Sequence, residues 1–131
     1  MPKAEMAIEP QQIYHEHCLE TMARMPDGLL DMTVTSPPYD DLRDYNGYHF
    51  PVEDIAAELF RTTKPGGVVI WVVGDRTVKG SESLSSFKDA IAFNDAGFRV
   101  HDTMIYGKNN PIPSDCGRRY RQAFEYIFCF S

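Results

Sequence analysis

The sequence predicts an α/β domain built on a mostly parallel sheet. Short apolar runs alternate with stretches of helical periodicity, and this order of elements is typical of a parallel sheet covered by helices. One run, Val68–Val73, is apolar throughout and rich in β-branched residues, which predicts a strand buried at the centre of the sheet. Another, Leu30–Thr35, leads directly into two prolines and must end there, because proline cannot continue a β-ladder.

The elements before the central strand follow from periodicity and from turn residues. Helices are placed where apolar residues recur at three- and four-residue intervals, and their ends are placed at Pro and Gly. In chain order we expect a strand at Ile13–His15, a helix at Leu19–Met25, the strand Leu30–Thr35, a loop at Asp40–Pro51 and a helix at Val52–Thr63.

The elements after the central strand continue the alternation. Trp71 is expected in the core, and Asp75 follows at the carboxyl end of the strand, where open α/β sheets place their ligands. An acidic residue at this place is about as often a helix or turn cap. We expect a helix at Leu84–Asp95 with Leu84, Phe87, Ala90 and Ile91 on its inner face, a strand at Phe98–Tyr106, a Pro-rich loop at Lys108–Pro113 and a last strand at Ala123–Phe130.

Length and composition limit the class of protein. With 131 residues, 43% of them hydrophobic, the chain has the size of one globular domain over residues 1–131. No segment is apolar enough to span a membrane and the N-terminus does not resemble a signal peptide, so we expect a cytoplasmic protein. The three cysteines are odd in number and far apart, and the histidines show no ligand spacing, so we expect reduced thiols and no metal.

The net charge of −6 argues against a protein that coats nucleic acid nonspecifically. The only concentration of basic residues is Arg118-Arg119-Tyr120-Arg121 together with Lys108. Such a cluster can contact a phosphate backbone, although a short basic run is more often a solvated turn or a set of ion pairs.

The run Ser36-Pro37-Pro38-Tyr39 is the motif that carries chemistry, because it lies at the end of a hydrophobic strand. The exocyclic amino nitrogen of cytosine or adenine is a poor nucleophile, since its lone pair is delocalised into the ring. The Ser36 hydroxyl and the Pro37 carbonyl could accept its two N–H bonds and direct the lone pair at a methyl donor. Two prolines would hold these acceptors still, and Tyr39 offers a ring on which an extruded base could stack. The simpler interpretation is a strand-terminating turn with a half-buried tyrosine.

The surrounding sequence favours the catalytic interpretation. The chain resembles the DNA amino-methyltransferases whose catalytic motif precedes their cofactor motif, from Ile13 to the last strand. The resemblance is carried by Ile13–Glu20, by Met25–Tyr39, by the helix-to-strand turn Phe60–Gly67, by Tyr106–Pro113, which is similar to the family's W-x-K-x-N-P-x-P loop, and by Arg119 with Glu125–Phe128.

The resemblance implies a partial Rossmann-like methyltransferase fold, with helices on both faces of a mostly parallel sheet and an antiparallel C-terminal strand. It implies transfer of a methyl group from S-adenosylmethionine to cytosine N4 or adenine N6 in DNA, and serine at position 36 favours cytosine. The implied site residues are Ser36, Pro37, Pro38 and Tyr39 for catalysis, His17, Thr35 and Asp75 for the cofactor, and Lys108, Asn110, Arg118, Arg119 and Arg121 for DNA.

The chain departs from the family at two places. Glu16-His17 stands where the family usually has Gly-Asp, and the glycine-rich cofactor motif and the specificity region are not found. We therefore expect a fragment of a methyltransferase domain or a subunit that needs a second chain carrying the cofactor motif, with an exposed sheet edge that could also support a homodimer. The alternatives are an inactive remnant that binds DNA or a partner chain, and an amino-group methyltransferase acting on protein or RNA.

Overall fold

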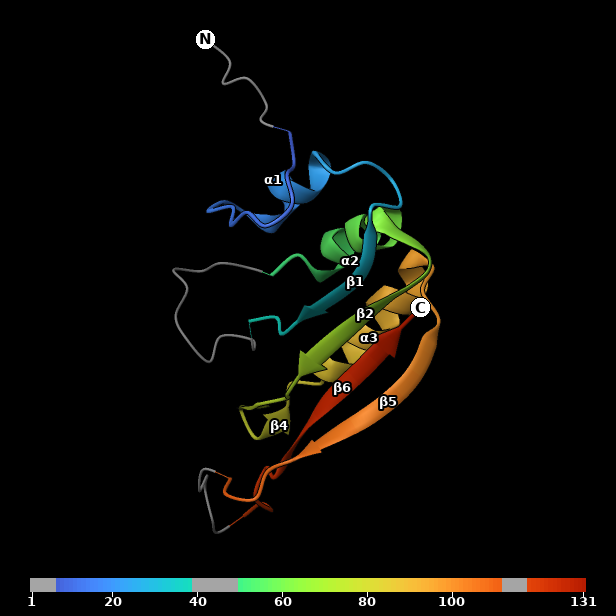
Figure 1. Cartoon of the computed structure of the whole chain (residues 1–131). Coiled ribbons are helices and arrows are strands. Elements are labelled where there is room, and N and C mark those ends of the chain that lie inside the picture. The colour runs from blue at the N-terminus through green and yellow to red at the C-terminus, as the bar shows by residue number, and fades with distance from the viewer. Residues whose placement is uncertain (1–6, 39–49, 112–117) are drawn as a thin grey trace.

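The computed structural model describes residues 7–38, 50–111 and 118–131, which contain three helices and six strands. Figure 1 shows how they follow one another. The elements are α1 (Cys18–Ala23), β1 (Leu30–Thr35), α2 (Val52–Thr62), β2 (Thr63–Val73), β3 (Thr77–Val78), β4 (Ser81–Glu82), α3 (Ser85–Ala96), β5 (Val100–Gly107) and β6 (Phe124–Phe130). Except at Ile13–His15, the strands and helices expected from the sequence are present, with their ends shifted by a few residues.

The main sheet has four strands in the order β1-β2-β6-β5. β1 pairs in parallel with β2, whereas β6 lies antiparallel to both β2 and β5. β1, β2 and β5 therefore run in one direction and only the C-terminal strand runs against them, which confirms the predicted sheet. A small hairpin of β3 and β4 leaves the carboxyl end of β2.

β2 begins five residues before the predicted start at Val68. Leu30 of β1 pairs with Thr63, but Met32 already pairs with Val68, so β2 bulges between these two contacts. The bulge uses Gly66, whose φ is +82°, and Gly67, at which a Cβ atom would lie 2.7 Å from the Thr63 side chain. The Pro-Gly-Gly segment thus interrupts the strand pairing without ending the strand.

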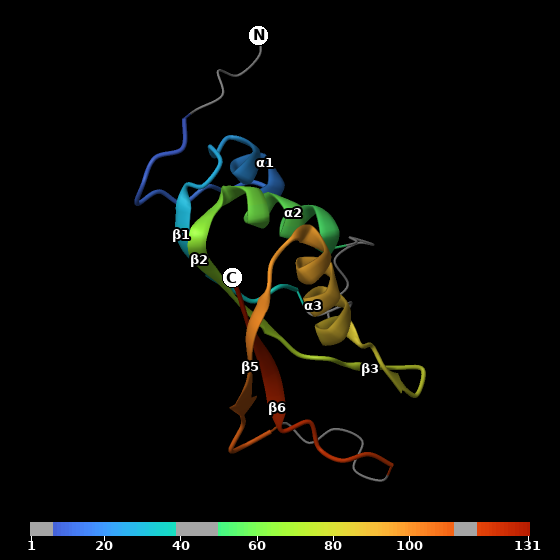
Figure 2. The ribbon, with the colours of Figure 1, turned by 90° about the vertical axis from the view of Figure 1, so that its right-hand side faces the viewer.

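All three helices lie on one face of the sheet, as Figures 1 and 2 show together. The sequence analysis expected helices on both faces, whereas the described helices cover only one of them. The helix face carries the core, in which Val69, Trp71 and Val73 of β2 alternate toward the helices and are at most 2% exposed. Aromatic rings fill much of this layer, with Phe93 of α3 stacked on Phe130 at 4.3 Å between ring centroids.

The inner face of α3 differs from the prediction. Ser85, Ser86, Asp89 and Phe93 are its buried residues. Three residues expected to face inward are exposed instead: Leu84 by 46%, Phe87 by 47% and Ile91 by 60%. The expected inner face was wrong because polar groups on the opposing elements satisfy the serines and the aspartate, so hydrophobicity alone did not decide which side is buried.

The predicted strand at Ile13–His15 was also wrong. The segment has no regular secondary structure, and Ile13 is 98% exposed. Tyr14 is held locally, since its hydroxyl accepts a hydrogen bond from the Glu9 amide at 2.8 Å and its ring lies 5.5 Å from the Arg24 guanidinium. Within the described part of the chain, no helix has the length and hydrophobicity needed to cross a lipid bilayer.

Candidate active site at the tip of strand β1

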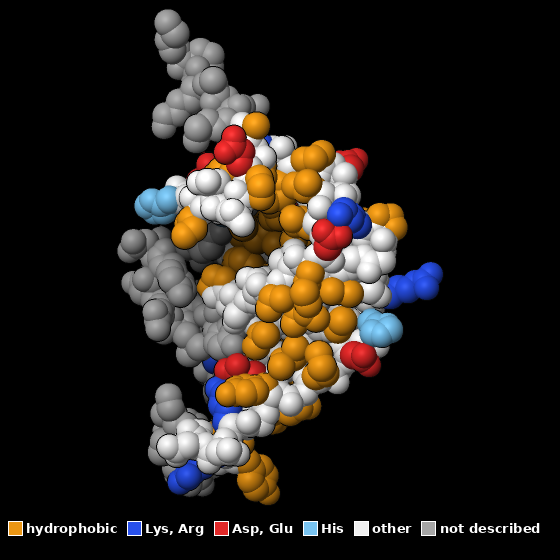
Figure 3. All heavy atoms as spheres, in the orientation of Figure 1, with side chains coloured by type: hydrophobic (Ala, Val, Ile, Leu, Met, Phe, Trp, Pro, Cys, Tyr) orange, Lys and Arg blue, Asp and Glu red, His pale blue; other side chains and the backbone are white. Residues whose placement is uncertain are grey.

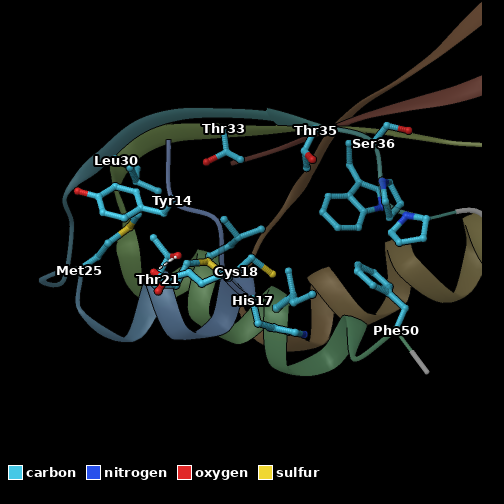
Figure 4. Close-up of a pocket in the computed structure, with 17 residues that line it drawn as sticks. Tyr14, His17, Cys18, Thr21, Met25, Leu30, Thr33, Thr35, Ser36 and Phe50 are labelled. Carbon is cyan, nitrogen blue, oxygen red and sulfur yellow. Dashed lines mark hydrogen bonds between the residues drawn. The ribbon is translucent and has the colours of Figure 1, made fainter. Parts of the chain in front are cut away.

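A pocket of about 580 Å³ lies between the carboxyl half of β1 and the helices α1 and α2. Its volume is within the range of small-molecule and cofactor sites. The lining is mainly apolar and includes Met22, Met25, Ile55 and Leu59, with polar atoms supplied by a few threonines and by the start of α1. Figure 4 shows the strand as its roof and the helices as its floor.

The catalytic residues expected from the sequence meet at this pocket as far as they are described. Ser36, Pro37 and Pro38 line it directly after β1 ends, and Pro37 is buried. In Figure 4 the side chains of Thr33 and Thr35 point toward the helices, whereas Ser36 points away from them. Successive residues of a strand face opposite sides, so the threonines face the pocket and the Ser36 hydroxyl faces its outer rim. Tyr39 lies outside the described residues.

Two of the three residues expected to bind the cofactor, His17 and Thr35, are on the pocket wall. His17 is the N-cap of α1, and its Nδ1 accepts a hydrogen bond from the Leu19 amide at 3.2 Å. Histidine therefore replaces the family's acidic residue with a cap that begins the helix, and the ring remains part of the pocket lining. Thr35 is the last residue of β1 and lies opposite Trp71.

Glu16, the other departure from the family, is held by α1. Its carboxylate accepts hydrogen bonds from Arg24, one of them 3.1 Å long, and from the Thr21 hydroxyl at 2.7 Å. The bond from Arg24, followed by that from Thr21, lowers the pKa of Glu16 below its usual value. The carboxylate therefore stays ionised near neutral pH and ties the entry of α1 to its end.

Arg61 of α2 fixes the α1 wall to the rest of the fold. Its guanidinium donates to the Met22 carbonyl at 2.7 Å and to the Met25 carbonyl at 2.8 Å, both at the end of α1. Glu58 and Asp27 hold the same group from the other side, and these carboxylates, Glu58 first, raise the pKa of Arg61 above its ordinary value. The carbonyls at the end of a helix are good acceptors for a cation, so this contact caps α1.

An aromatic pair closes the inner end of the pocket. Phe50 and Trp71 both line it, with 6.2 Å between their ring centroids. The Trp71 indole N–H donates to the buried Asp89 carboxylate of α3 at 2.9 Å, which fixes the orientation of the ring. The sequence placed Trp71 in the core, which is confirmed, but it did not assign Phe50 or Trp71 to the site. The signal available was the position of Phe50 at the end of the loop that follows the motif.

Asp75 is not brought to the pocket lining. Its Oδ1 accepts a hydrogen bond from the Ser86 amide at 2.8 Å, and the Ser86 hydroxyl donates to Oδ2. Ser83 donates to the same carboxylate at 3.4 Å. Both oxygens thus accept hydrogen bonds at the first turn of α3. A contact of Asp75 with the cofactor stays a prediction.

The basic residues expected to bind DNA lie at the end of the sheet where β1 and β2 end, in the connection between β5 and β6 (Figure 1). Arg118, Arg119 and Arg121 are exposed, as is Asn110. Arg119 donates to the Gly80 carbonyl in the β3–β4 hairpin, which places the basic segment beside that hairpin. Lys108 forms an ion pair with Glu125 at 2.6 Å, so part of its charge is already neutralised.

No three His, Cys, Asp or Glu side chains gather into a metal site among the described residues. The absence of a metal from the reaction stays a prediction.

This fold and this site define a class of protein, the DNA methylases that modify exocyclic amino groups. The sequence profile of the N6/N4 DNA methylase family matches residues 30–131, and the chain belongs to that family. The orphan methyltransferase M.BamHII of Bacillus amyloliquefaciens is 60% identical over 105 residues, which are 80% of this chain and 39% of that protein.

Solved structures agree with the fold. A protein of Thermus thermophilus described as a DNA modification methylase, in complex with S-adenosyl-L-methionine, superposes with a TM-score of 0.67 at 28% identity, over 86% of this chain and 49% of the other. The PvuII DNA methyltransferase, described as cytosine-N4-specific, gives a TM-score of 0.75 at 22% identity, over 90% and 48% of the two chains. The chain therefore spans about half the length of the solved relatives and less of M.BamHII.

Proposed function

We propose that the chain is the catalytic part of a DNA methyltransferase that transfers a methyl group from S-adenosylmethionine to cytosine N4 or adenine N6. The observation that carries the proposal is the position of Ser36-Pro37-Pro38 at the tip of β1, on the wall of a pocket of cofactor size. Family membership supports the same reaction. Around the tip only Ser36 bears on the choice between the two bases, and serine at this position favours cytosine.

The two sides of the strand tip suit different reactants. Thr33 and Thr35 face the pocket, whose lining is mainly apolar and suits the cofactor, with Glu16 and His17 at the wall. The Ser36 hydroxyl faces the outer rim, where a base removed from the duplex would arrive. Ser36 and Pro37 both line the pocket at this tip, so a methyl donor in the pocket and an amino nitrogen at its rim would meet there.

In this arrangement Ser36 and Pro37 accept the two N–H bonds of the amino group and hold its lone pair in line with the methyl group. The bound cofactor supplies an activated methyl carbon on a sulfonium. The N–C bond forms as the S–C bond breaks, the electron pair of that bond stays on sulfur, and the nitrogen releases one proton to water. We assign base stacking to Tyr39.

DNA is the substrate of the family, and we propose that the basic residues at the same end of the sheet contact its backbone. Arg118, Arg119, Arg121 and Asn110 are exposed there, and Lys108 lies at the end of β5. We also propose that the chain is one part of a methyltransferase domain and works with a polypeptide that carries the cofactor motif. Cytoplasmic location and a homodimer remain predictions.

Cofactor binding can be tested without catalysis, because Trp71 is the single tryptophan and lines the pocket. We expect its fluorescence to change on titration with S-adenosylmethionine, and we expect Thr35→Val to weaken the response. The matched control is Thr77→Val, a threonine exposed in the β3–β4 hairpin. If both variants and the parent respond equally, this pocket does not bind the cofactor.

The reaction is tested by the product. The chain, alone and together with the part of M.BamHII outside the match, is incubated with S-adenosylmethionine bearing a deuterated methyl group and with DNA, RNA or protein. We expect labelled N4-methylcytosine or N6-methyladenine in DNA by mass spectrometry of nucleosides. Label found only in RNA or on protein amides would replace DNA as the substrate, and label in none of them would support an inactive remnant.

A further inference from the structure

Two aromatic rings lie at the end of the pocket that carries the strand tip. Trp71 pairs with Thr35, the residue before Ser36, in the register of β1 and β2. The ring centroids of Phe50 and Trp71 are 6.2 Å apart, and the ring planes are inclined by 35°. Figure 4 shows Phe50 and Ser36 at one end of the pocket and Met25 at the other, and the space-filling view of Figure 3 shows the hydrophobic hollow between strand and helices. We call Phe50 and Trp71 the aromatic corner.

The proposed reaction brings a positive charge to the same end of the pocket. A methyl carbon and the nitrogen that attacks it must approach to about 3–3.5 Å before they react. In the proposed function Ser36 and Pro37 hold that nitrogen, and both line the pocket. The sulfonium that carries the methyl group must therefore lie beside them, at the end that the aromatic corner closes.

The acidic part of the described pocket lining is already engaged elsewhere. Glu16 is the one acidic residue among the described residues that line the pocket. Both of its carboxylate oxygens accept hydrogen bonds from Arg24, and the Thr21 hydroxyl donates to one of them. The Arg24 guanidinium therefore balances this charge at α1. A cation that enters a mainly apolar pocket without a partner is costly, so the sulfonium needs another group.

Aromatic rings can be that group, because the face of a ring carries negative charge density that attracts a cation within about 6 Å of the centroid. At the observed separation of 6.2 Å between the centroids, one cation can lie within this range of both rings. The Trp71 indole is held in place by its hydrogen bond to Asp89 at 2.9 Å. Trp71 is buried and Phe50 is half-buried, so Phe50 offers the more accessible face.

We propose that the aromatic corner binds the sulfonium of S-adenosylmethionine by cation–π attraction and thereby distinguishes the charged methyl donor from its uncharged product, S-adenosylhomocysteine. When the S–C bond breaks, its electron pair stays on sulfur and the positive charge on sulfur is lost. The product keeps its adenosine and amino-acid parts but loses this attraction, which favours its release. This inference rests on the proposed function, because the pocket is the proposed cofactor site.

The test measures the ratio of the affinities of the whole chain for S-adenosylmethionine and S-adenosylhomocysteine, by isothermal titration calorimetry. We expect the parent to bind S-adenosylmethionine at least about threefold more tightly. Phe50→Leu keeps an apolar side chain but removes the ring, so the preference should be lost mainly through weaker binding of S-adenosylmethionine. Phe50→Tyr, which keeps a ring, should retain the preference. Met25→Leu, at the other end of the pocket, is the matched control and should also retain it. Circular dichroism checks the folding of each variant.

A nitrogen analogue of the cofactor separates the charge from the methyl group. In this analogue an N-methyl amine replaces the sulfonium, and it is charged only when protonated. S-adenosylmethionine, whose sulfonium charge does not depend on pH, is the reference at each pH. We expect the parent, but not Phe50→Leu, to prefer the protonated analogue.

Three outcomes would overturn the proposal while the proposed function stands: equal binding of both ligands by the parent, an equal loss of both affinities in Phe50→Leu, or an equal change of the ratio in Met25→Leu. Binding of neither ligand by the parent would contradict the pocket as the cofactor site and the proposal with it.

Discussion

The two faces of the sheet are built from alternating residues of the same strands, yet they differ in nearly every physical respect. On the helix face Val69 and Phe130 are fully buried and Trp71 is 1% exposed, whereas on the opposite face of the sheet Val34 and Met32 are more than half exposed. The strands carry hydrophobic residues on both sides, as strands of a sheet covered on both faces do. The strands therefore have the hydrophobic pattern of a sheet covered on both faces, whereas the described helices cover one face.

The largest contrast in stability is expected between the two faces. Phe93→Ala removes a ring that stacks on Phe130 and packs against Trp71, and should lower the free energy of unfolding by about 3–5 kcal/mol. Met104→Ala, on the opposite face of the sheet, should change the free energy of unfolding by less than about 0.5 kcal/mol in the chain alone. Urea denaturation followed by circular dichroism measures both. A large loss for Met104→Ala would mean that the face opposite the helices is already covered.

The polar contact inside the helix face gives the next effect. Trp71→Phe keeps most of the ring packing but removes the N–H that donates to Asp89, so the free energy of unfolding should fall by about 1–3 kcal/mol. The double variant with Asp89→Asn or Asp89→Leu should lose less than the sum of the single changes, as a double-mutant cycle would show. Additive losses would show that the two side chains do not depend on each other.

The contacts of Arg61 that attach α1 to α2 should contribute less to stability than the Trp71–Asp89 contact, and they depend on the geometry of the guanidinium group. Arg61→Lys keeps the charge but cannot contact the Met22 and Met25 carbonyls and two carboxylates at once. We expect a loss of about 1–2 kcal/mol of stability, and a weaker fluorescence response of Trp71 to cofactor because the pocket wall loosens. Arg99→Lys, at an exposed position between α3 and β5, is the control and should have no effect. Equal behaviour of the two variants would contradict the role of Arg61.

The smallest effect is that of pH on the same attachment. The Arg61 side chain, through its hydrogen bonds, lowers the pKa of Glu58 below its usual value. A depressed folded-state pKa contributes stability that is present above the unfolded pKa and is lost as pH falls through the folded pKa. For the partly exposed Arg61–Glu58 pair we expect a contribution of less than about 1 kcal/mol to the free energy of unfolding, and this contribution is lost below about pH 4.5. Glu58→Gln should make the free energy of unfolding depend less on pH in the acid range. If the pH dependence is unchanged, the Arg61–Glu58 pair does not cause it.

The sequence was sufficient where a local signal decides the structure. The apolar run of β2 and the prolines after β1 placed both strands, and the strand tip placed Ser36 and Pro37 at the pocket. It was insufficient where distant groups decide. The buried side of α3 depends on Asp75 and Trp71, which meet its polar residues from other elements. Ile13 has a β-branched side chain but no partner strand among the described residues, so β-propensity alone predicted a strand that does not form.

The aromatic wall of the site could not be predicted for a related reason. Trp71 looked like an ordinary core residue, and its contact with Phe50 depends on how the chain returns to the sheet at the start of α2. Conversely, Asp75 was considered for the cofactor because it lies at a strand end, but the position of α3 determines what its carboxylate binds. Both outcomes depend on tertiary packing rather than on neighbours in sequence.

The central claim is that the tip of β1 aligns an exocyclic amino group for methyl transfer, and single-turnover kinetics with Ser36→Ala test it most directly. The assay uses the chain together with the part of M.BamHII outside the match, DNA and saturating S-adenosylmethionine, with Ser81→Ala in the exposed hairpin as the control. We predict that Ser36→Ala lowers the rate of the chemical step by about 10²–10³-fold and leaves cofactor affinity unchanged. Equal rates for Ser36→Ala, Ser81→Ala and the parent would contradict the account.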